Sequence, residues 1–241
     1  DTRVRAIGLY LEGIVDIAAL SVVAMRALSE GVPLVALKAG GTQESAELTI
    51  SHSGTLAVDN ESWSALFKRL AIVEAGSPKA LIEALKLLGS QKPPKGNRIV
   101  AAANSGGYAA LIGEKGRILG LEFPTPTKQQ RDDLARAVPD LVSLLNPLDW
   151  NLPWASMSTP ETSNTGFGIM MDDRCDLLIY FIDWPRVPDV AEVWWPTLEG
   201  LIQLNDRIDR PIVVSCVFPD GLPVELRVRL ANAGLISLQG L

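Results

Sequence analysis

The fold is decided by residues 5–40, RAIGLYLEGIVDIAALSVVAMRALSEGVPLVALKAG. The stretch opens at 5–11 with a short apolar run of the length of a buried strand. Apolar residues then recur with helical spacing over 15–30, and Gly31 stands where a helix C-cap glycine belongs. A second apolar run follows at 34–38. Strand, helix and strand in this order predict a βαβ unit with parallel strands and a right-handed crossover.

The same alternation of apolar runs and helical spacings continues along the rest of the chain. Residues 89–98, GSQKPPKGNR, have the composition of a linker between two halves. We therefore expect an α/β protein with two doubly wound parallel-sheet domains, at 1–90 and 96–241. The further strands are expected at 99–103, 176–182 and 211–217, and the further helices at 60–70, 79–88, 108–119, 192–208 and 223–233. Residues 39–55 are expected to form a loop, and 150–172 receive no assignment.

Composition and charge exclude several classes of protein. The chain has 241 residues, of which 47% are apolar, and this is enough for a buried core. Its 22 Lys+Arg stand against 28 Asp+Glu, whereas a protein that binds nucleic acid backbones needs a basic face. Every apolar run is well short of the roughly 20 residues that span a bilayer. We therefore expect neither a nucleic acid nor a membrane as a partner.

The cysteine and histidine content argues against a metal site. The two cysteines, Cys175 and Cys216, lie far apart in the sequence, and no His/Cys/carboxylate cluster has the spacing of metal ligands. This pattern also excludes a disulfide framework, so the reducing cytoplasm is the expected compartment. We expect no metal bound by this chain.

His52 is the only histidine and the first candidate for chemistry. It lies in ISHSGTL, residues 50–56, a loop outside the end of a predicted parallel strand, where open α/β sheets bind their ligands. A surface or capping histidine is one explanation. A nucleophile or general base is the other, because the pKa of imidazole is near neutrality. The backbone N–H groups around Ser51, Ser53 and Gly54 would then form a nest for a phosphate.

Glu12 ends the first predicted strand and is expected at the same sheet edge as His52. Its carboxylate has two possible uses. It complements the positive end of the following helix, or it accepts an imidazole N–H and fixes the tautomer of the ring.

Two turns of the second half are further candidates. Residues 104–107 (Asn104, Ser105, Gly106 and Gly107) join a strand to a helix, which makes them either a tight turn or a phosphate site at a helix N-terminus. Residues 146–150, NPLDW, favour a turn that is either structural or in contact with substrate. Six tryptophans either line an apolar pocket or pack domain surfaces.

Four segments, taken in order, resemble the NDP-forming (ADP-forming) acyl-CoA synthetase family, which is related to succinyl-CoA synthetase. Residues 9–14, LYLEGI, resemble the family's strand that ends in an active-site Glu, and 33–40 resemble its next strand and glycine turn. Residues 51–57, SHSGTLA, resemble the Ser-His-Thr-Gly-Ala-Leu-Ala segment that carries the phosphorylated histidine. Residues 96–107 and 146–149 resemble the second flavodoxin-like domain, whose helix N-terminus helps to hold the phosphate.

The resemblance implies two succinyl-CoA synthetase-like, flavodoxin-like domains and a role for each candidate. His52 would carry the phosphate and Glu12 would orient its ring. The remaining candidates would bind the phosphate: Ser51, Ser53, Gly54, Asn104, Ser105, Gly106 and Gly107. In this family an ATP-grasp domain phosphorylates the histidine, the phosphate is exchanged with an acyl phosphate, and CoA attacks the acyl phosphate. The implied substrates are CoA, ATP with Mg²⁺ and a small carboxylic acid.

The chain also departs from the family pattern. Gly41, Thr55, Val58 and Tyr108 stand where the family often has Arg, Ala, Gly and Pro. The CoA-binding domain and the ATP-grasp domain are missing, and the first residue is Asp1. We therefore expect a core fragment, truncated at its N-terminus and inactive alone, of a homo-oligomeric synthetase that supplies both domains.

Two alternatives stay open at this point. The first is a non-catalytic module that responds to CoA or acyl-CoA and derives from the same family. The second is a relative that uses the same domains for another acyl or carbamoyl transfer.

Overall fold

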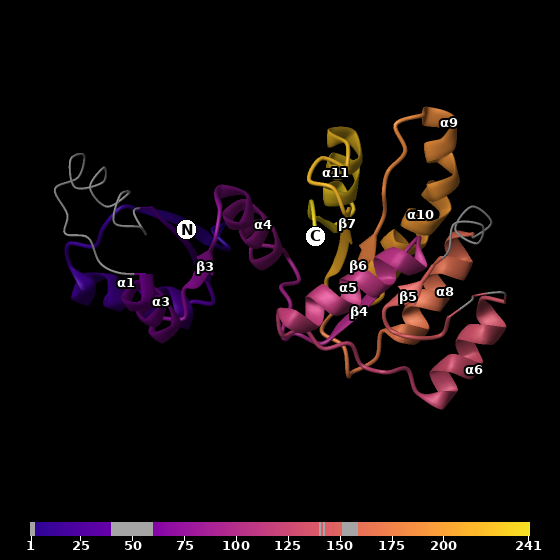
Figure 1. Cartoon of the computed structure of the whole chain (residues 1–241), viewed down its shortest axis with the longest axis horizontal. Coiled ribbons are helices and arrows are strands. Elements are labelled where there is room, and N and C mark those ends of the chain that lie inside the picture. The colour runs from indigo at the N-terminus through magenta and orange to yellow at the C-terminus, as the bar shows by residue number, and fades with distance from the viewer. Residues whose placement is uncertain (1–2, 40–59, 140, 142, 151–158) are drawn as a thin grey trace. The chain divides into compact units, whose positions relative to one another are not determined.

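The computed structural model describes residues 3–39, 60–139, 141, 143–150 and 159–241 (Figure 1). The chain forms two compact units, Asp1–Ser90 (unit 1) and Gln91–Leu241 (unit 2). All strand pairs in the described residues are parallel. The predicted α/β class with parallel sheets is therefore confirmed. No helix in these ranges has the length and apolarity needed to cross a bilayer.

Unit 1 contains a three-stranded sheet of order β1-β2-β3. Its strands are β1 (Ile7–Leu11), β2 (Leu34–Lys38) and β3 (Val73–Ala75), and its helices are α1 (Ile17–Ser29), α3 (Asn60–Arg69) and α4 (Pro78–Leu88). Helix α1 is capped by Asp16, which accepts a hydrogen bond from the N–H of Ala19. Past its end Gly31 has a φ of +69°, so the predicted glycine after this helix is confirmed.

The two faces of the unit 1 sheet are covered by different helices. Leu34 and Ala36 of β2 pack with α1 and α3, whereas Val35 and Leu37 pack with α4. This alternation follows from the two-residue period of a strand. The helix after the last strand, α4, thus lies on the face opposite to α1 and α3.

Unit 2 contains a five-stranded sheet of order β5-β4-β6-β7-β8. Numbered within the unit, this is the strand order 2-1-3-4-5 of the flavodoxin fold. The strands are β4 (Ile99–Ala103), β5 (Leu148–Asp149), β6 (Leu177–Phe181), β7 (Ile212–Ser215) and β8 (Ile236–Ser237). The helices are α5 (Gly106–Ile118), α6 (Lys128–Ala137), α8 (Pro160–Met170), α9 (Pro188–Ala191), the 3-10 helix η1 (Glu192–Trp194), α10 (Trp195–Asn205) and α11 (Val224–Asn232).

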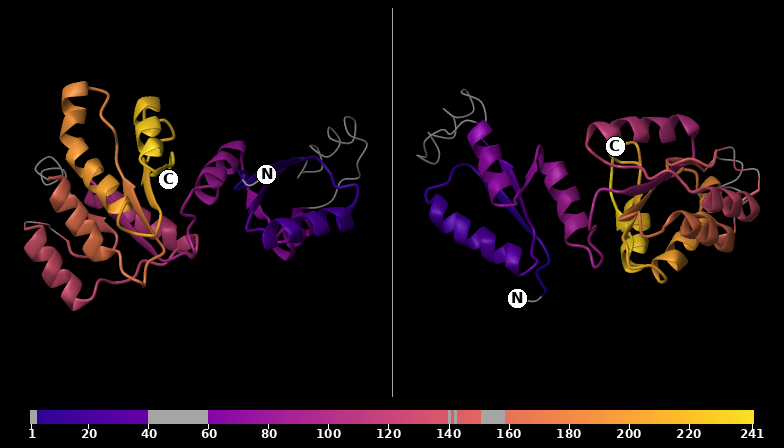
Figure 2. Two further views of the ribbon diagram at one scale, coloured as in Figure 1. Left: turned by 180° about the vertical axis from the view of Figure 1, so that it is seen from behind. Right: turned by 90° about the horizontal axis from the view of Figure 1, so that it is seen from below.

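Helices lie on both faces of the unit 2 sheet, as the right-hand view of Figure 2 shows. The main core joins even-numbered strand residues such as Val100 and Leu178 to α6, α8, α10 and α11. Helix α5 lies on the other face. Right-handed crossovers place α5 and the helices between β5 and β8 on opposite faces, because the chain moves in one direction from β4 to β5 and in the opposite direction from β5 through β8. Helix α6, which follows α5 in the same connection, packs with the main core.

The turn predicted at 146–150 is wrong in part, because Leu148 and Asp149 form β5 beside β4. The bond between Asn146 and Pro147 is cis, and the Asn146 side chain accepts from the N–H of Ala101 (3.0 Å) and donates to the C=O of Ile99 (2.7 Å). These hydrogen bonds to β4 hold the segment 146–150 beside the sheet, although its sequence pattern alone indicates only a turn. Among the described residues, five further elements have no counterpart in the sequence-based prediction: β3, α6, α8, α9 and β8.

The tryptophans of unit 2 that the structure describes serve packing. Trp150 is fully buried and stacks on Phe167, with ring centroids 4.4 Å apart. Trp184 and Trp195 meet edge to face at 5.1 Å, and Trp194 is buried in the same core. The core therefore accounts for these four side chains.

Candidate functional site

Glu12 lies at the carboxyl edge of the unit 1 sheet. Leu11 and Lys38 are paired at the ends of β1 and β2, and the N–H of Ala39 donates to the C=O of Leu11 at 2.9 Å. Glu12 follows directly and is exposed. Its carboxylate is thus presented at the edge where parallel sheets of this type bind ligands.

Four predicted residues, Ser51, His52, Ser53 and Gly54, lie outside the described residues. The described chain on either side of their segment is held together at the carboxyl edge. The Lys38 ammonium, at the end of β2, donates to Asn60 Oδ1, at the start of α3, at 2.9 Å. The segment that contains His52 therefore leaves and rejoins unit 1 at the edge that presents Glu12.

The four predicted residues of unit 2 lie at the junction of β4 and α5, with Asn104 and Ser105 before the helix and Gly106 and Gly107 at its start. Ser105 is the N-cap of α5, yet its side chain makes no capping hydrogen bond. Gly106 and Gly107 form the exposed first turn, which holds no acidic residue. A helix begins with N–H groups that have no partner within the helix and with the positive end of its dipole. This N-terminus is therefore open to an anion.

Asn104 lies at the carboxyl edge of the unit 2 sheet and also makes a hydrogen bond to a residue of a neighbouring strand. Its side-chain oxygen accepts a hydrogen bond from the hydroxyl of Tyr180, in β6. Tyr180 is completely buried, and this burial raises the pKa of its phenol. The bond fixes the orientation of the Asn104 amide and leaves its nitrogen as the remaining donor.

Asp149 brings a carboxylate to the same helix N-terminus. It ends β5, and its Oδ2 would stand 2.8 Å from a Cβ placed on Gly106. Its Oδ1 is buried and has no hydrogen-bond partner. Burial raises the pKa of Asp149, because desolvation disfavours the charged carboxylate.

A second aspartate, Asp183, follows the end of β6. Its Oδ1 is also buried without a hydrogen-bond partner. Tyr108 lies in the first turn of α5, and its interaction with the Asp183 carboxylate raises the pKa of its phenol. Because β4 and β6 flank the point where the strand order reverses, Asn104 and Asp183 stand on either side of the switch point, where doubly wound sheets bind ligands.

Sequence reasoning included Asp149 only within a turn that is either structural or in contact with substrate, and it did not propose Asp183 or Tyr108 as site residues. The signal for the two aspartates is their position at the end of a strand, because Asp149 is the last residue of β5 and Asp183 closely follows β6. That signal became usable only once β5 was known to pair beside β4. Glu12 belongs to unit 1, and the other described site residues belong to unit 2.

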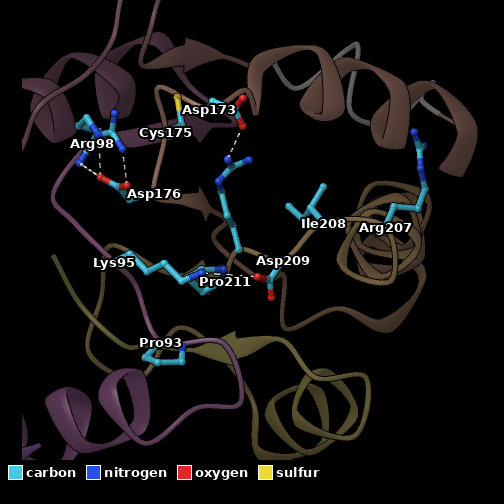
Figure 3. Close-up of a pocket in the computed structure, with 11 residues that line it drawn as sticks. Pro93, Lys95, Arg98, Asp173, Cys175, Asp176, Arg207, Ile208, Asp209 and Pro211 are labelled. Atoms are coloured by element: carbon cyan, nitrogen blue, oxygen red, sulfur yellow. Dashed lines mark hydrogen bonds and ion pairs between the residues drawn. The ribbon is translucent and has the colours of Figure 1, made fainter. Parts of the chain in front are cut away.

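A polar pocket of about 490 Å³ lies at the opposite, amino edge of the unit 2 sheet (Figure 3). Its walls come from the segments that precede β4, β6 and β7. Arg98 makes two hydrogen bonds to the carboxylate of Asp176, at 2.9 and 2.7 Å, and Arg210 pairs with Asp173 at 2.8 Å. Lys95 pairs with Asp209 at 3.5 Å, and Arg207 donates to the side-chain oxygen of Asn164. Each charged side chain of the pocket thus has a partner within unit 2, so we interpret the pocket as a structural feature of the sheet end.

The carboxyl edge of unit 2 can hold an anion at an uncapped helix and can accept protons or hydrogen bonds at two buried carboxylate oxygens. This combination suits a phosphate together with the donor groups of a second ligand. Among the residues that the structure describes, no group of three or more His, Cys, Asp and Glu could hold a metal ion.

Residues 1–88 match the family model described as the succinyl-CoA ligase like flavodoxin domain. The chain is 28% identical over 219 residues to the alpha subunit of acetate–CoA ligase [ADP-forming] II from Pyrococcus furiosus, an alignment that covers 90% of this chain and 46% of that subunit. It is 28% identical over 149 residues to acetate–CoA ligase [ADP-forming] from Methanocaldococcus jannaschii, which covers 62% of this chain and 21% of that protein. The chain thus spans less than half of the length of either relative.

A solved structure supports the same fold. The dinucleotide forming acetyl-coenzyme A synthetase 1 of Ca. Korarchaeum cryptofilum, in complex with phosphate and ADP, matches with a TM-score of 0.76 at 22% identity. The match covers 96% of this chain and 49% of that protein. Together with the family model and the curated relatives, it confirms the resemblance seen in the sequence. By these matches, the chain is similar to the succinyl-CoA ligase like flavodoxin domain over residues 1–88, and to ADP-forming acetate–CoA ligases over 90% or 62% of its length.

Proposed function

We propose that this chain is the phosphoryl-carrier core of an acid–CoA ligase that forms ADP. A ring nitrogen of His52 attacks the γ-phosphorus of ATP, and ADP leaves. The phosphate then passes to the carboxylate of a small organic acid, which frees His52 and forms an acyl phosphate. The thiol of CoA attacks the acyl carbon, so that acyl-CoA and inorganic phosphate are released.

Each site residue has a physical task in this scheme. Glu12 accepts the N–H of one ring nitrogen of His52 and thereby keeps the other nitrogen available for phosphorus. The first-turn N–H groups of α5, at Gly106 and Gly107, bind the phosphate oxygens. Asn104 and Ser105 add side-chain donors at this turn, and the backbone around Ser51, Ser53 and Gly54 adds N–H groups from the histidine segment.

The single observation that carries the proposal is the open N-terminus of α5. Its N-cap serine makes no capping bond, its first turn is two exposed glycines, and it lies at the carboxyl edge of a flavodoxin-order sheet. In support, Glu12 lies at the corresponding edge of unit 1, from which the His52 segment departs. The curated relatives are ADP-forming acid–CoA ligases by name.

The reaction needs partners that supply ATP and CoA. We propose that an ATP-grasp domain of the parent protein binds ATP with its Mg²⁺, and that a CoA-binding domain of the parent presents the thiol. In this scheme the parent acts as a homo-oligomer in the reducing cytoplasm, and both described cysteines are free thiols. The acid is a small carboxylic acid.

The proposal is tested by assaying the parent protein for acyl-CoA formation from ATP, CoA and a panel of small acids. We expect His52→Ala to abolish turnover and Glu12→Gln to lower kcat while the protein stays folded. Lys95→Ala, in the polar pocket at the opposite sheet edge, is the control and should leave turnover unchanged. Turnover that survives His52→Ala would refute the phosphohistidine route. CoA binding without any turnover would favour the regulatory module.

A further inference from the structure

Tyr180, in β6, brings a hydroxyl group into an otherwise apolar layer of the unit 2 core. The other even-numbered residues of β4 and β6, which share its face of the sheet, are Val100, Ala102 and Leu178. All four side chains are buried, and Tyr180 has no exposed surface. Burial of an unpaired hydroxyl is costly, and a phenylalanine would fill nearly the same space without that cost. The phenol oxygen therefore needs a partner.

The partner is the side chain of Asn104, and the strand register explains how the two meet. Strands β4 and β6 are parallel, and Tyr180 is paired with Ala102. Asn104 follows two residues after Ala102, which places it on the same face by the two-residue period of a strand. The small Ala102 leaves room for the phenol to lean along the strand direction, and its hydroxyl donates to Asn104 Oδ1. A side chain of the sheet interior thus reaches the turn that follows β4.

The phenol is itself held in place by the core. Its ring meets that of Phe167 edge to face, with centroids 5.6 Å apart. The side chain of Thr197, in α10, also interacts with the phenol, and Thr197 is completely buried. The amide of Asn104, which is only half-buried, is therefore tied through Tyr180 to the packed interior of unit 2.

This contact determines which end of the Asn104 amide is presented at the turn. Its Oδ1 is engaged by the phenol, whereas its Nδ2 makes no hydrogen bond to a described residue. The nitrogen of an amide only donates and the oxygen only accepts. Asn104 directly precedes Ser105, the N-cap of α5, so Nδ2 adds a donor beside the N–H groups of the first turn. A rotated amide would present an oxygen, which repels a phosphate.

We propose that Tyr180 is a positioning residue of the phosphate site, because its hydroxyl holds the Asn104 amide with Nδ2 directed to an anion at the N-terminus of α5. Tyr180 acts through Asn104 and does not touch the phosphate. This inference rests on the phosphate site of the proposed function, but not on the chemistry of His52 or on the identity of the acid. It makes the core of unit 2 responsible for the orientation of a donor in the turn.

The test is a double-mutant cycle between Tyr180→Phe and Asn104→Ala in the parent protein, with the Kd for inorganic phosphate measured by calorimetric titration. A hydrogen bond to a charged group is worth roughly 10- to 100-fold in affinity, so Asn104→Ala should raise the Kd at least about 10-fold. Tyr180→Phe keeps the ring and should raise the Kd about 3- to 10-fold, the range of a neutral hydrogen bond. The double variant should bind no more weakly than Asn104→Ala, because Tyr180 acts only through Asn104.

Ser215→Ala is the matched control. It also removes a buried hydroxyl from the unit 2 sheet, but this hydroxyl lies 3.5 Å from the C=O of Gly240, and the Kd should not change. Urea unfolding checks that each variant is folded. Thr197→Val loosens the same phenol from α10 and gives a second cycle, in which the same coupling to Asn104 is expected.

Three results would overturn the inference. An effect of Tyr180→Phe that persists in the Asn104→Ala background would show that Tyr180 acts through the fold as a whole. An unchanged Kd in Tyr180→Phe, beside a raised Kd in Asn104→Ala, would leave the phosphate site intact without a role for Tyr180. Unchanged binding in Asn104→Ala would remove Asn104 from the site. None of these results depends on His52, so turnover of the His52→Ala variant tests the proposed function separately.

Discussion

The carboxylate of Asp149 lies directly against the Cα of Gly106. A Cβ on Gly106 would stand 2.8 Å from Asp149 Oδ2, whereas a Cβ on Gly107 would meet nothing closer than Ser105 Oγ, at 3.6 Å. The close approach of the Asp149 carboxylate therefore requires glycine at position 106. At position 107 there is space for a methyl group. The last residue of β5 and the first turn of α5 are thus in contact at the carboxyl edge of the sheet.

Alanine substitutions at the two glycines should have different effects. Gly107→Ala should leave stability unchanged or raise it by up to about 1 kcal/mol, because alanine has the higher helix propensity. Gly106→Ala forces the Asp149 carboxylate aside and should be less stable than Gly107→Ala in urea unfolding. In an Asp149→Ala background the difference should disappear. A difference that persists there would show that the contact with Asp149 is not its cause.

Removing the Asp149 charge should strengthen anion binding at the N-terminus of α5. A carboxylate beside a bound phosphate repels it, so Asp149→Asn is expected to lower the Kd for inorganic phosphate. The pKa of Asp149 is raised by burial, so the wild-type affinity should improve as the pH falls and this carboxyl protonates. Calorimetric titration across the acidic range measures both effects. If Asp149→Asn left the affinity unchanged, phosphate would not bind at this helix N-terminus.

The interaction between Tyr108 and Asp183 should be visible in a spectrophotometric titration of the phenols. The chain has three tyrosines, and the interaction with the Asp183 carboxylate raises the pKa of Tyr108 above its ordinary value of 10.0. Asp183→Asn should lower that pKa toward 10, and Tyr108→Phe should remove the transition. Because the folded pKa is raised, the interaction stabilises the fold below pH about 10, and this contribution is lost as the pH rises through the folded pKa. An unshifted Tyr108 transition in Asp183→Asn would contradict the contact.

The Arg98–Asp176 pair should contribute stability that depends on pH. Asp176 accepts from the backbone N–H of Arg98 (3.0 Å) as well as from its guanidinium, and its side chain is 8% exposed. These bonds lower the pKa of Asp176. Asp176→Asn should therefore cost about 1–3 kcal/mol at pH 7.

The cost of Asp176→Asn should shrink in acid. A lowered folded pKa means that the contribution is present above the unfolded pKa of about 3.9 and is lost as the pH falls through the folded value. Asp173→Asn is the matched control, because Asp173 pairs with Arg210 but is fully exposed, and it should cost little at any pH. Equal effects of the two variants in urea unfolding at pH 7 and pH 3 would argue against a special role for Asp176.

The sequence pattern was sufficient to predict elements that carry a clear local signal. The apolar runs at β2 and β4 form inner strands with a neighbour on each side, and Gly31 follows α1 with a positive φ. Strands β5 and β8 have two residues each and carry no periodicity of their own. They exist because neighbouring strands offer hydrogen bonds, so local pattern could not reveal them. Helix α6 is strongly polar and depends on a capping box between Thr127 and Gln130 that was not recognised.

The candidate site was predictable only in part for the same reason. The strand–turn–helix pattern at Asn104–Gly107 is local and was visible in the sequence. The approach of Asp149 to Gly106 and of Asp183 to Tyr108 depends on strand order, which a single sequence does not state. The role of His52 stays a prediction, because its segment lies outside the described residues.

The most direct test of the central claim is phosphorus NMR, with intact mass, on the parent protein after mixing with Mg-ATP. A His52→Ala variant is treated in parallel. The account predicts one acid-labile, base-stable phosphate with the chemical shift of phosphohistidine, present in the wild type and absent from His52→Ala. A phosphate that remains in His52→Ala, or the absence of phosphate from a parent protein that still forms acyl-CoA, would contradict it.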